Sequence, residues 1–343
     1  MNGSIKILTP GRFWRWMGLF ALFMILCAIA GPLVGSTKVD FARALDFSIP
    51  FADNSDRLIL FGTRIPRVLL ALCVGASLAI AGAAMQGLLR NPLASPFTLG
   101  VASGGTLGAA IAIWMGVGKT AFKVPGTVFG AFVFSLITIA IVWGLAYRRG
   151  RLPTGLLLLA GVSINFFFGA IVMLLQYTSD FTQSFQLVRW MMGSLDTVGY
   201  SSVWGVAPVL VIGAGVLFIY ARAFNLLALG DDAAQTAGVN VKRLELVGFI
   251  VAGLLAGAAV SQVGPIGFVG LIVPHTVRLM VGPDYRLVIP GSLLVGGGFL
   301  VLCDLLSRTV MAPLELPPGI ITAILGAPFF LSLLRSKGRE ISV

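Results

Sequence analysis

The chain has 343 residues, of which 57% are hydrophobic and only 11% charged, and its formal net charge is +11. Soluble domains carry roughly 25% charged residues, so this chain has too few polar side chains to cover a water-facing surface. The composition excludes a soluble enzyme and a disordered chain, and the absence of a basic patch interleaved with aromatic residues argues against nucleic-acid binding. We interpret it as an all-α polytopic membrane protein, with one transmembrane domain over residues 1–343.

A membrane-spanning helix needs about 20 mostly apolar residues. Runs of this kind predict ten spans, which are Phe13–Val34, Val68–Leu88, Thr98–Val117, Gly126–Tyr147, Thr154–Tyr177, Val203–Ala221, Leu244–Val263, Phe268–Met280, Leu287–Cys303 and Gly319–Leu334. The eighth run is short, and we expect its helix to extend back through residues 264–267.

Ten spans place both termini on the same side of the membrane. Most of the 24 Lys and Arg residues fall in segments on that side, and positive charge is enriched in cytoplasmic segments. We therefore expect both termini to be cytoplasmic, with anionic lipid as a further contact for the basic residues. Residues 178–202 would then be periplasmic, and residues 224–242 would form a cytoplasmic loop.

The second and seventh spans show weak similarity to each other. Aligning them pairs Arg67 with Arg243 and Gln86 with Gln262, together with two pairs of alanines and one of leucines. The two spans run in opposite directions, so the pattern indicates an inverted repeat of the kind found in transporters. Matches in helices rich in Ala and Gly also arise by chance.

The predicted spans contain almost no charged residues. Glu245, Arg278 and Asp304 lie near span ends, where we expect them to reach the interface by snorkelling. Proton-coupled and ion-coupled transporters use chains of intramembrane carboxylates or histidines, so their absence argues against secondary transport. His275 is the single histidine, and neither metal-ligand spacing nor a nucleophile–base arrangement accompanies it, so we predict no metal site and no catalytic residues.

The loop at residues 224–242 has the signals of a short helix. Gly230 interrupts the preceding element, Asp231 and Asp232 favour a helix N-terminus, and Gly238 stops the helix. Such a helix on the inner face can dock a cytoplasmic partner, although an ordinary interfacial helix has the same pattern.

Three arginines stand at span ends on the outer side, which normally disfavours positive charge. They are Arg64, Arg67 and Arg308. Pro66 predicts a rigid turn that keeps Arg64 and Arg67 close together. Arginine pairs bidentately with carboxylates, so these residues are candidates for recognising an acidic periplasmic partner, with lipid headgroups as the alternative.

At these residues the sequence resembles the FecCD family, the permease subunits of bacterial importers for iron–siderophores, haem and vitamin B12. The resemblance extends from about Arg64 to Arg335. Its motifs include Arg64-Ile65-Pro66-Arg67, Arg90-Asn91-Pro92-Leu93-Ala94-Ser95-Pro96, Gly264-Pro265-Ile266-Gly267-Phe268-Val269-Gly270-Leu271, Pro274-His275 with Arg278, Glu315-Leu316-Pro317 and Gly326-Ala327-Pro328-Phe329-Phe330.

The resemblance implies a type II ABC importer permease fold that works with several partners. These are a second permease subunit (identical or paralogous), two cytoplasmic ATP-binding subunits and a periplasmic substrate-binding protein. No cofactor is implied on this chain, because ATP and Mg²⁺ would be bound by the partner ATPase.

The resemblance also implies roles for individual residues. Binding-protein docking would fall to Arg64, Arg67 and Arg308, and ATPase coupling to Leu229, Gly230, Asp231, Asp232, Ala234, Gly238 and Val239. Ala237 departs from the leucine usual in the family. By the same resemblance Asn165, Phe166 and Phe168 are candidates for lining the translocation pathway, although packing in the core explains the aromatic rings as well.

We therefore predict an ATP-driven permease that receives an iron chelate, either a ferric siderophore or haem, from a binding protein and imports it by alternating access. A cobalamin importer is the alternative, and a secondary transporter is less favoured.

Overall fold

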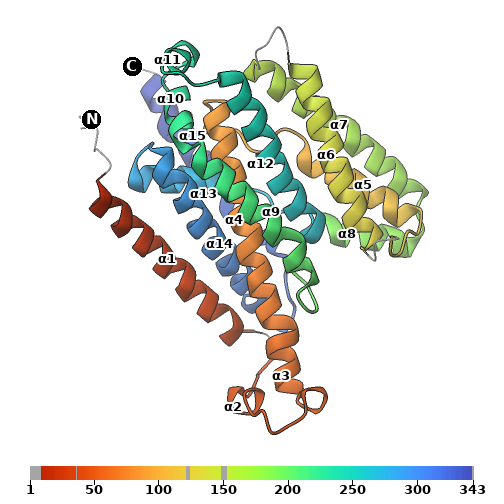
Figure 1. Cartoon of the computed structure of the whole chain (residues 1–343). Helices are drawn as coiled ribbons and strands as arrows, with labels where there is room; N and C mark the ends of the chain where they lie inside the picture. The colour runs from red at the N-terminus through yellow and green to blue at the C-terminus, as the bar shows by residue number, and fades with distance from the viewer. Residues whose placement is uncertain (1–8, 36, 121–123, 148–152, 342–343) are drawn as a thin grey trace.

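The computed structural model describes residues 9–35, 37–120, 124–147 and 153–341, which fold into a bundle of helices (Figure 1). Within these residues, seven helices are long and apolar enough to cross a membrane, and three shorter apolar helices join them. The seven are α1 (Pro10–Leu33), the continuous helix Ser55–Leu88 that ends in α4 (Ile65–Leu88), α6 (Gly126–Ala146), α7 (Thr154–Thr178), α9 (Ser201–Ile219), α12 (Val241–Val263) and α14 (Tyr285–Thr309). The shorter ones are α5 (Val101–Trp114), α13 (Val269–Val281) and the Pro318–Ser332 part of α15 (Pro318–Ile341). Together they match the ten predicted spans.

Small helices mark the two ends of the bundle. At one end, at the bottom of Figure 1, lie α2 (Phe41–Ala44), η1 (Phe51–Asp53) and α3 (Ser55–Ile59), with η2 (Leu60–Arg64) joining α3 to α4. Toward the opposite end lie α10 (Ala221–Leu227) and α11 (Asp231–Thr236), while α8 (Phe181–Met191) connects α7 to α9. The predicted outer and inner segments therefore lie at opposite ends of the molecule.

Helix α4 is the central helix of the bundle. In the most apolar 18-residue stretch of its continuous helix, 83% is buried inside the protein. The corresponding stretches of α1 and α9 are each 22% buried. Lipid is as apolar as leucine, so membrane helices associate through close packing of small residues rather than through hydrophobicity. A Cβ added to Gly82 would lie 1.8 Å from the Gly270 carbonyl oxygen of α13, and one added to Gly75 would lie 2.2 Å from that of Gly296 in α14. Glycine at these positions lets the helix backbones touch.

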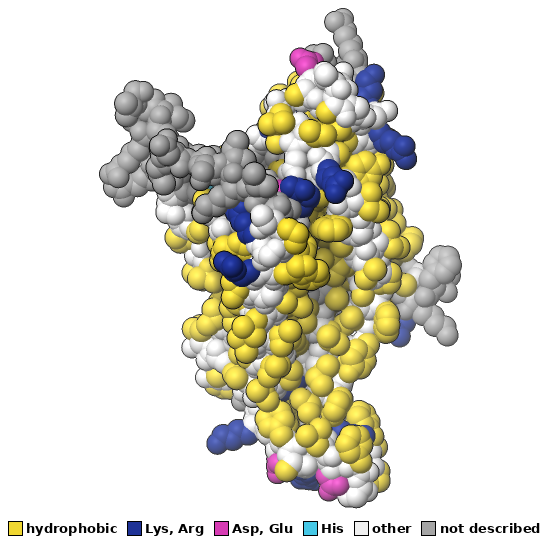
Figure 2. All heavy atoms as spheres, turned by 60° about the vertical axis from the view of Figure 1, so that its left-hand side comes forward, with side chains coloured by type: hydrophobic (Ala, Val, Ile, Leu, Met, Phe, Trp, Pro, Cys, Tyr) yellow, Lys and Arg dark blue, Asp and Glu magenta, His cyan; other side chains and the backbone are white. Residues whose placement is uncertain are grey.

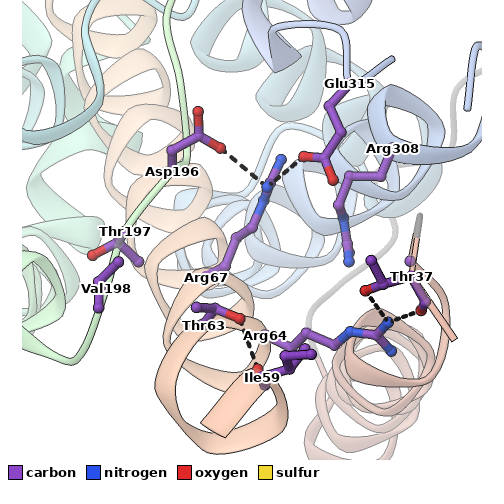
Figure 3. A pocket seen from close by; sticks show the side chains of 11 residues that line it. Thr37, Ile59, Thr63, Arg64, Arg67, Asp196, Thr197, Val198, Arg308 and Glu315 are labelled. Atoms are coloured by element: carbon purple, nitrogen blue, oxygen red, sulfur yellow. Dashed lines mark hydrogen bonds and ion pairs between the residues drawn. The ribbon is translucent and has the colours of Figure 1, made fainter. Parts of the chain in front are cut away.

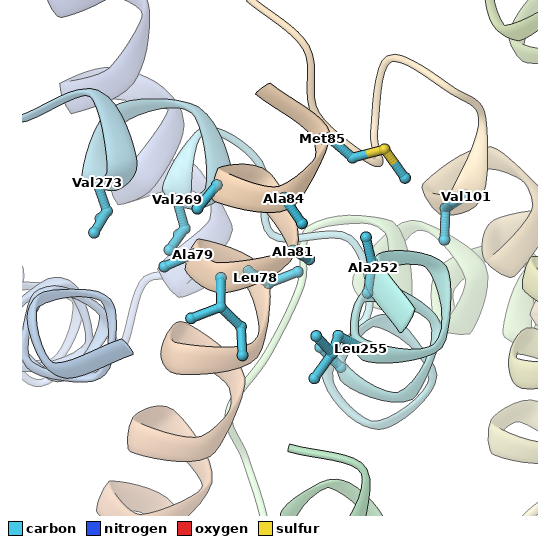
Figure 4. Close-up of a cluster of buried hydrophobic side chains, with 14 of the residues drawn as sticks. Leu78, Ala79, Ala81, Ala84, Met85, Val101, Ala252, Leu255, Val269 and Val273 are labelled. Atoms are coloured by element: carbon cyan, nitrogen blue, oxygen red, sulfur yellow. The ribbon is translucent and has the colours of Figure 1, made fainter. Parts of the chain in front are cut away.

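Around these contacts the core consists of small and branched side chains. Figure 4 shows Leu78 and Met85 of α4 among side chains from α5, α12 and α13, including Val101, Leu255 and Val273. This packing fixes α4 against both halves of the chain.

Two non-helical stretches interrupt the bundle, and one of them corrects a prediction. Residues 264–268 are not helical, so α13 does not extend back through 264–267 as expected. Gly264 takes a φ of +73° and Phe268 a φ of +67°, and Pro265 has no N–H to donate to a helix. The interrupted backbone finds partners within the protein: the Ser194 N–H donates to the Val263 carbonyl at 2.7 Å, as an irregular segment at membrane depth requires.

The second interruption, residues 89–100, lies between α4 and α5. The succession of a long buried helix, a break and a short helix thus occurs at both α4–α5 and α12–α13, the two spans in which the sequence indicates a repeat. Gln86 bridges the halves, because its side-chain amide donates to the Leu271 carbonyl of α13 at 3.2 Å.

The outer surface is that of a membrane protein. On the face drawn in Figure 2, hydrophobic side chains cover the middle, and charged side chains gather toward the two ends. Aromatic and aliphatic side chains such as Trp204 of α9 and Phe166 of α7 are more than two-thirds exposed, which is stable only against lipid or another apolar surface.

Candidate functional site

Arg64 and Arg67 lie on a continuous helix rather than at the predicted turn. Helix α3 passes through the π-helical turn η2 directly into α4, and Pro66 falls in the first turn of α4. Proline lacks the N–H that would bond to the Gly62 carbonyl four residues earlier. The Gly199 N–H donates to that carbonyl instead, at 2.8 Å. A partner from outside the helix therefore lets the chain stay helical through Pro66.

Arg64 and Arg308 cap the end of α1. That helix has no basic residue in its last turn, and its final carbonyls have no intrahelical donors. Arg64 donates to the carbonyls of Pro32, at 2.8 Å, and Thr37. Arg308 donates to the carbonyls of Val34 at 2.8 Å and Gly31 at 3.1 Å. Both side chains are buried, and both join α1 to the helices behind it.

Asp304 is the buried centre of this arrangement. Its side chain is 0% exposed and lies 2.8 Å from Arg67 Nε and 3.0 Å from Arg308 Nη2. The expectation that Asp304 reaches the interface by snorkelling is therefore wrong. A carboxylate is stable in this position because two guanidinium groups offset its loss of hydration.

Arg67 also has partners on its other side. Its Nη1 lies 2.8 Å from Glu315 Oε2 and 3.1 Å from Asp196 Oδ1. Figure 3 shows these carboxylates approaching Arg67 from two different connecting segments, with Arg64 and Thr37 nearby. Together these side chains line a pocket of about 320 Å³, whose other lining residues are Gly35, Ile59, Thr63, Thr197, Val198 and Arg308.

The structure thus brings the three predicted arginines together, in what we call the arginine cluster: Arg64, Arg67 and Arg308. It also places three carboxylates there whose role in the cluster the sequence interpretation missed. One signal was available, because Asp304 and Arg308 are spaced i, i+4 on one helix and such residues face each other.

At the opposite end, α11 has the predicted boundaries. Gly230 with a φ of +120° precedes it, and Gly238 with a φ of +85° follows it, conformations that favour glycine. Ala234 is completely buried, while Asp232 and Leu229 are exposed. Val239 donates its N–H to the Ala234 carbonyl at 2.9 Å and closes the turn. Helix α11 is thus a short, mostly exposed helix, and Ala234 is its buried residue.

Helix α11 is also connected to the end of α4. Asp231 forms an ion pair with Arg90, a residue whose φ of +46° places it in the left-handed region. Arg90 belongs to the non-helical stretch that follows α4. This pair joins α11 to the stretch that follows the central helix.

A hydrogen-bonded clamp holds the preceding helix α10 to the start of α14. The Asn225 side-chain amide donates to Asp284 Oδ1 at 2.7 Å, and its carbonyl accepts from the Tyr285 N–H at 2.8 Å. Burial disfavours the charged Asp284 carboxylate, but hydrogen bonds from Arg286 and Asn225 outweigh this and lower its pKa below the ordinary value. Phe224 stacks on Tyr285 with ring centroids 5.4 Å apart, which adds an aromatic contact to the junction.

The predicted pathway residues on α7 face different ways. Phe166 is 76% exposed, whereas Phe168 packs in the core and is 7% exposed. Asn165 accepts a hydrogen bond from Ser103 of α5 at 2.7 Å. Among the described residues, no group of three or more His, Cys, Asp or Glu side chains is placed to hold a metal ion.

Comparison with known proteins identifies the family. The model of the FecCD transport family matches residues 21–336. The chain belongs to this family.

Relatives in the family differ in the cargo that their names give. The hemin transport system permease protein HmuU of Yersinia pestis is 38% identical over 333 residues, covering 95% of this chain and 97% of the relative. The cobalamin import system permease protein BtuC of Halobacterium salinarum is 42% identical over 299 residues, covering 87% of this chain and 78% of the relative.

A solved structure agrees with the fold. A metal-chelate type ABC transporter in an inward-facing conformation superposes with a TM-score of 0.80 at 30% identity, covering 94% of this chain and 99% of that one. The chain is therefore a multi-pass permease of the ABC importer family that transports iron chelates, haem or vitamin B12.

Proposed function

We propose that this FecCD-family chain is the permease subunit through which an iron chelate, either a ferric siderophore or haem, enters the cytoplasm in an ATP-driven importer. The observation that carries the proposal is the placement of two candidate docking surfaces at opposite ends of one bundle. The arginine cluster lies at one end, and the short exposed helix α11 lies at the other.

The end with the arginine cluster would receive a periplasmic substrate-binding protein. Arg67 supports this role because its guanidinium group lines the pocket, where a carboxylate of the binding protein would reach it. Arg64 and Arg308 would hold the rim of that pocket, since both bind the end of α1.

The end with α11 would dock an ATPase subunit. Residues 229–239, with Leu229, Asp231 and Asp232 accessible, present a compact knob. The Arg90–Asp231 pair and the Asn225–Asp284 clamp would pass its movement to α4 and α14. ATP and Mg²⁺ would be bound and used by two such partner subunits, with no cofactor on this chain.

A second permease subunit, identical or paralogous, would complete the pathway. Helix α7 presents Phe166 outward beside Asn165, with Phe168 packed behind. We place the pathway along this face. The spans carry few charges, so the path would bind a bulky amphipathic chelate weakly and release it readily. Rigid-body tilting of the bundle would open the path alternately to the two sides. Both termini would be cytoplasmic, in a bacterial inner membrane.

Reconstitution tests this function. The permease is purified with the ATPase and binding protein encoded beside it, placed in lipid nanodiscs, and assayed for ATP hydrolysis with the binding protein loaded with haem, a ferric siderophore or cobalamin. Stimulation by an iron chelate supports the proposal. Failure of the ATPase to associate with a folded permease would refute it.

Cobalamin is the second candidate cargo, because the Halobacterium salinarum cobalamin permease is 42% identical to this chain. In the same assay, stimulation by cobalamin alone would replace the iron chelate with this cargo. The docking surfaces would keep their roles.

A further inference from the structure

The guanidinium group of Arg67 is already paired within this chain. Its Nε lies beside Asp304 and its Nη1 beside Glu315 and Asp196, and Asp196 also pairs with Arg189 at 3.3 Å. A partner carboxylate therefore meets an arginine whose donors are occupied. Docking onto it requires an exchange of ion pairs.

The two sides of Arg67 differ in how firmly they are held. On the inner side Nε is bound to Asp304, which is completely buried and shared with Arg308. Breaking a buried pair by removing one partner leaves an unpaired charge without water, which is strongly destabilising. This side therefore stays in place.

The outer side is open to exchange. Nη1 is bound to Glu315 and Asp196, whose side chains are 35% and 49% exposed. Both carboxylates lie in segments that connect helices, Asp196 between α8 and α9 and Glu315 between α14 and α15. Both carboxylates keep part of their contact with water while paired, although the Arg67 side chain itself is only 12% exposed. When one of them leaves, Arg67 keeps the other and Asp304 as partners. Either carboxylate can leave Arg67 at low cost.

We propose that Glu315 and Asp196 are placeholders on Arg67 that a carboxylate of the docking partner displaces, and that Asp304 is the positioning residue that keeps Arg67 aimed at the pocket during the exchange. The partner has an acidic surface and is the binding protein of the proposed function, on which this inference rests. The two intrachain carboxylates weaken docking, whereas the buried one is required for it.

The proposal is testable because neutralising different carboxylates around Arg67 should change the docking affinity in opposite directions. The assay is the affinity of the loaded binding protein encoded beside this permease for the permease–ATPase complex in nanodiscs. Glu315→Gln and Asp196→Asn remove competitors, and each should tighten binding about 2- to 5-fold, the worth of a partly exposed pair. Asp196→Asn also removes the partner of Arg189, so Glu315→Gln is the cleaner test of Arg67. Asp304→Asn should weaken binding at least about tenfold.

Salt dependence supplies a second readout that a purely structural role would not move. Docking to the wild type exchanges one ion pair for another, so its affinity should fall only shallowly as salt rises. In Glu315→Gln the partner has one intrachain carboxylate fewer to displace, so salt should weaken its binding more steeply.

Asp53→Asn is the matched control. Asp53 is an exposed carboxylate at the same end of the molecule, in η1, and no ion pair to the arginine cluster involves it. Its neutralisation reports the effect of lower negative charge alone, and affinity should stay near that of the wild type.

Three results would overturn the proposal: unchanged or weaker binding in Glu315→Gln and Asp196→Asn, equal tightening in Asp53→Asn, or wild-type affinity in a folded Asp304→Asn. Should Asp304→Asn fail to fold, the sign of the other two variants still decides. A wild-type complex that does not bind the protein at all would refute the proposed function instead.

Discussion

The contact between Gly82 of α4 and Gly270 of α13 gives a quantitative test of the packing. In Gly82→Ala the new methyl group would lie 1.8 Å from the Gly270 carbonyl oxygen, closer than any real contact. The obstacle is backbone, so no side-chain rotation relieves it, and the two helices would have to separate by about an ångström. Overpacking of a core costs about 1–3 kcal/mol when side chains adjust, and we expect this substitution to reach about 3 kcal/mol.

The assay is denaturation by SDS in mixed micelles, followed by tryptophan fluorescence. Gly215→Ala in α9 is the matched control, because nothing lies within 4 Å of its added Cβ. Its stability should equal that of the wild type or exceed it by up to about 1 kcal/mol, because Ala favours a helix more than Gly does. If Gly82→Ala were as stable as Gly215→Ala, the close approach of α4 and α13 would be wrong.

Three further predictions concern the two ends. Replacing Asp231 and Asp232 by Asn should lower uptake and the stimulated ATPase rate while membrane insertion stays intact, measured in nanodiscs; normal coupling would contradict the role of α11. Because the folded pKa of Asp284 is lowered, its contribution to stability is complete above the ordinary carboxyl pKa near 4 and is lost as pH falls through the lower folded value. Wild-type stability should therefore drop at acidic pH more than that of Asp284→Asn, measured as denaturation midpoints between about pH 6 and 3; parallel curves would contradict this. Arg64→Gln should cost about 1–3 kcal/mol, because the carbonyls of Pro32 and Thr37 lose a charged donor, and should speed hydrogen exchange at the end of α1; unchanged exchange would show that this cap is dispensable.

Much of the architecture follows from local sequence. Runs of apolar residues are long enough to define the spans, since a helix that satisfies its own backbone is the stable form of such a run in lipid. Helix α11 was equally predictable, because Gly230, Asp231 and Gly238 act on residues within one or two turns of themselves. The breaks are partly readable too: Gly264 and Pro265 forbid a helix through 264–267, although the short eighth run led us to extend one there.

The partners of the charged residues required the tertiary structure. Asp304 looks like an interfacial residue in the sequence because it lies near a span end, and only the packing of α14 against α4 and α1 buries it. Arg67 and Asp304 are 237 residues apart in the chain, yet they form an ion pair. Arg64 likewise donates to the Pro32 carbonyl at the end of α1, which lies 32 residues earlier in the chain. Local propensity acts over a few residues, whereas the stability of a buried charge depends on every helix that surrounds it. The local sequence therefore determined the spans, and the tertiary structure determined the ion pairs of the arginine cluster.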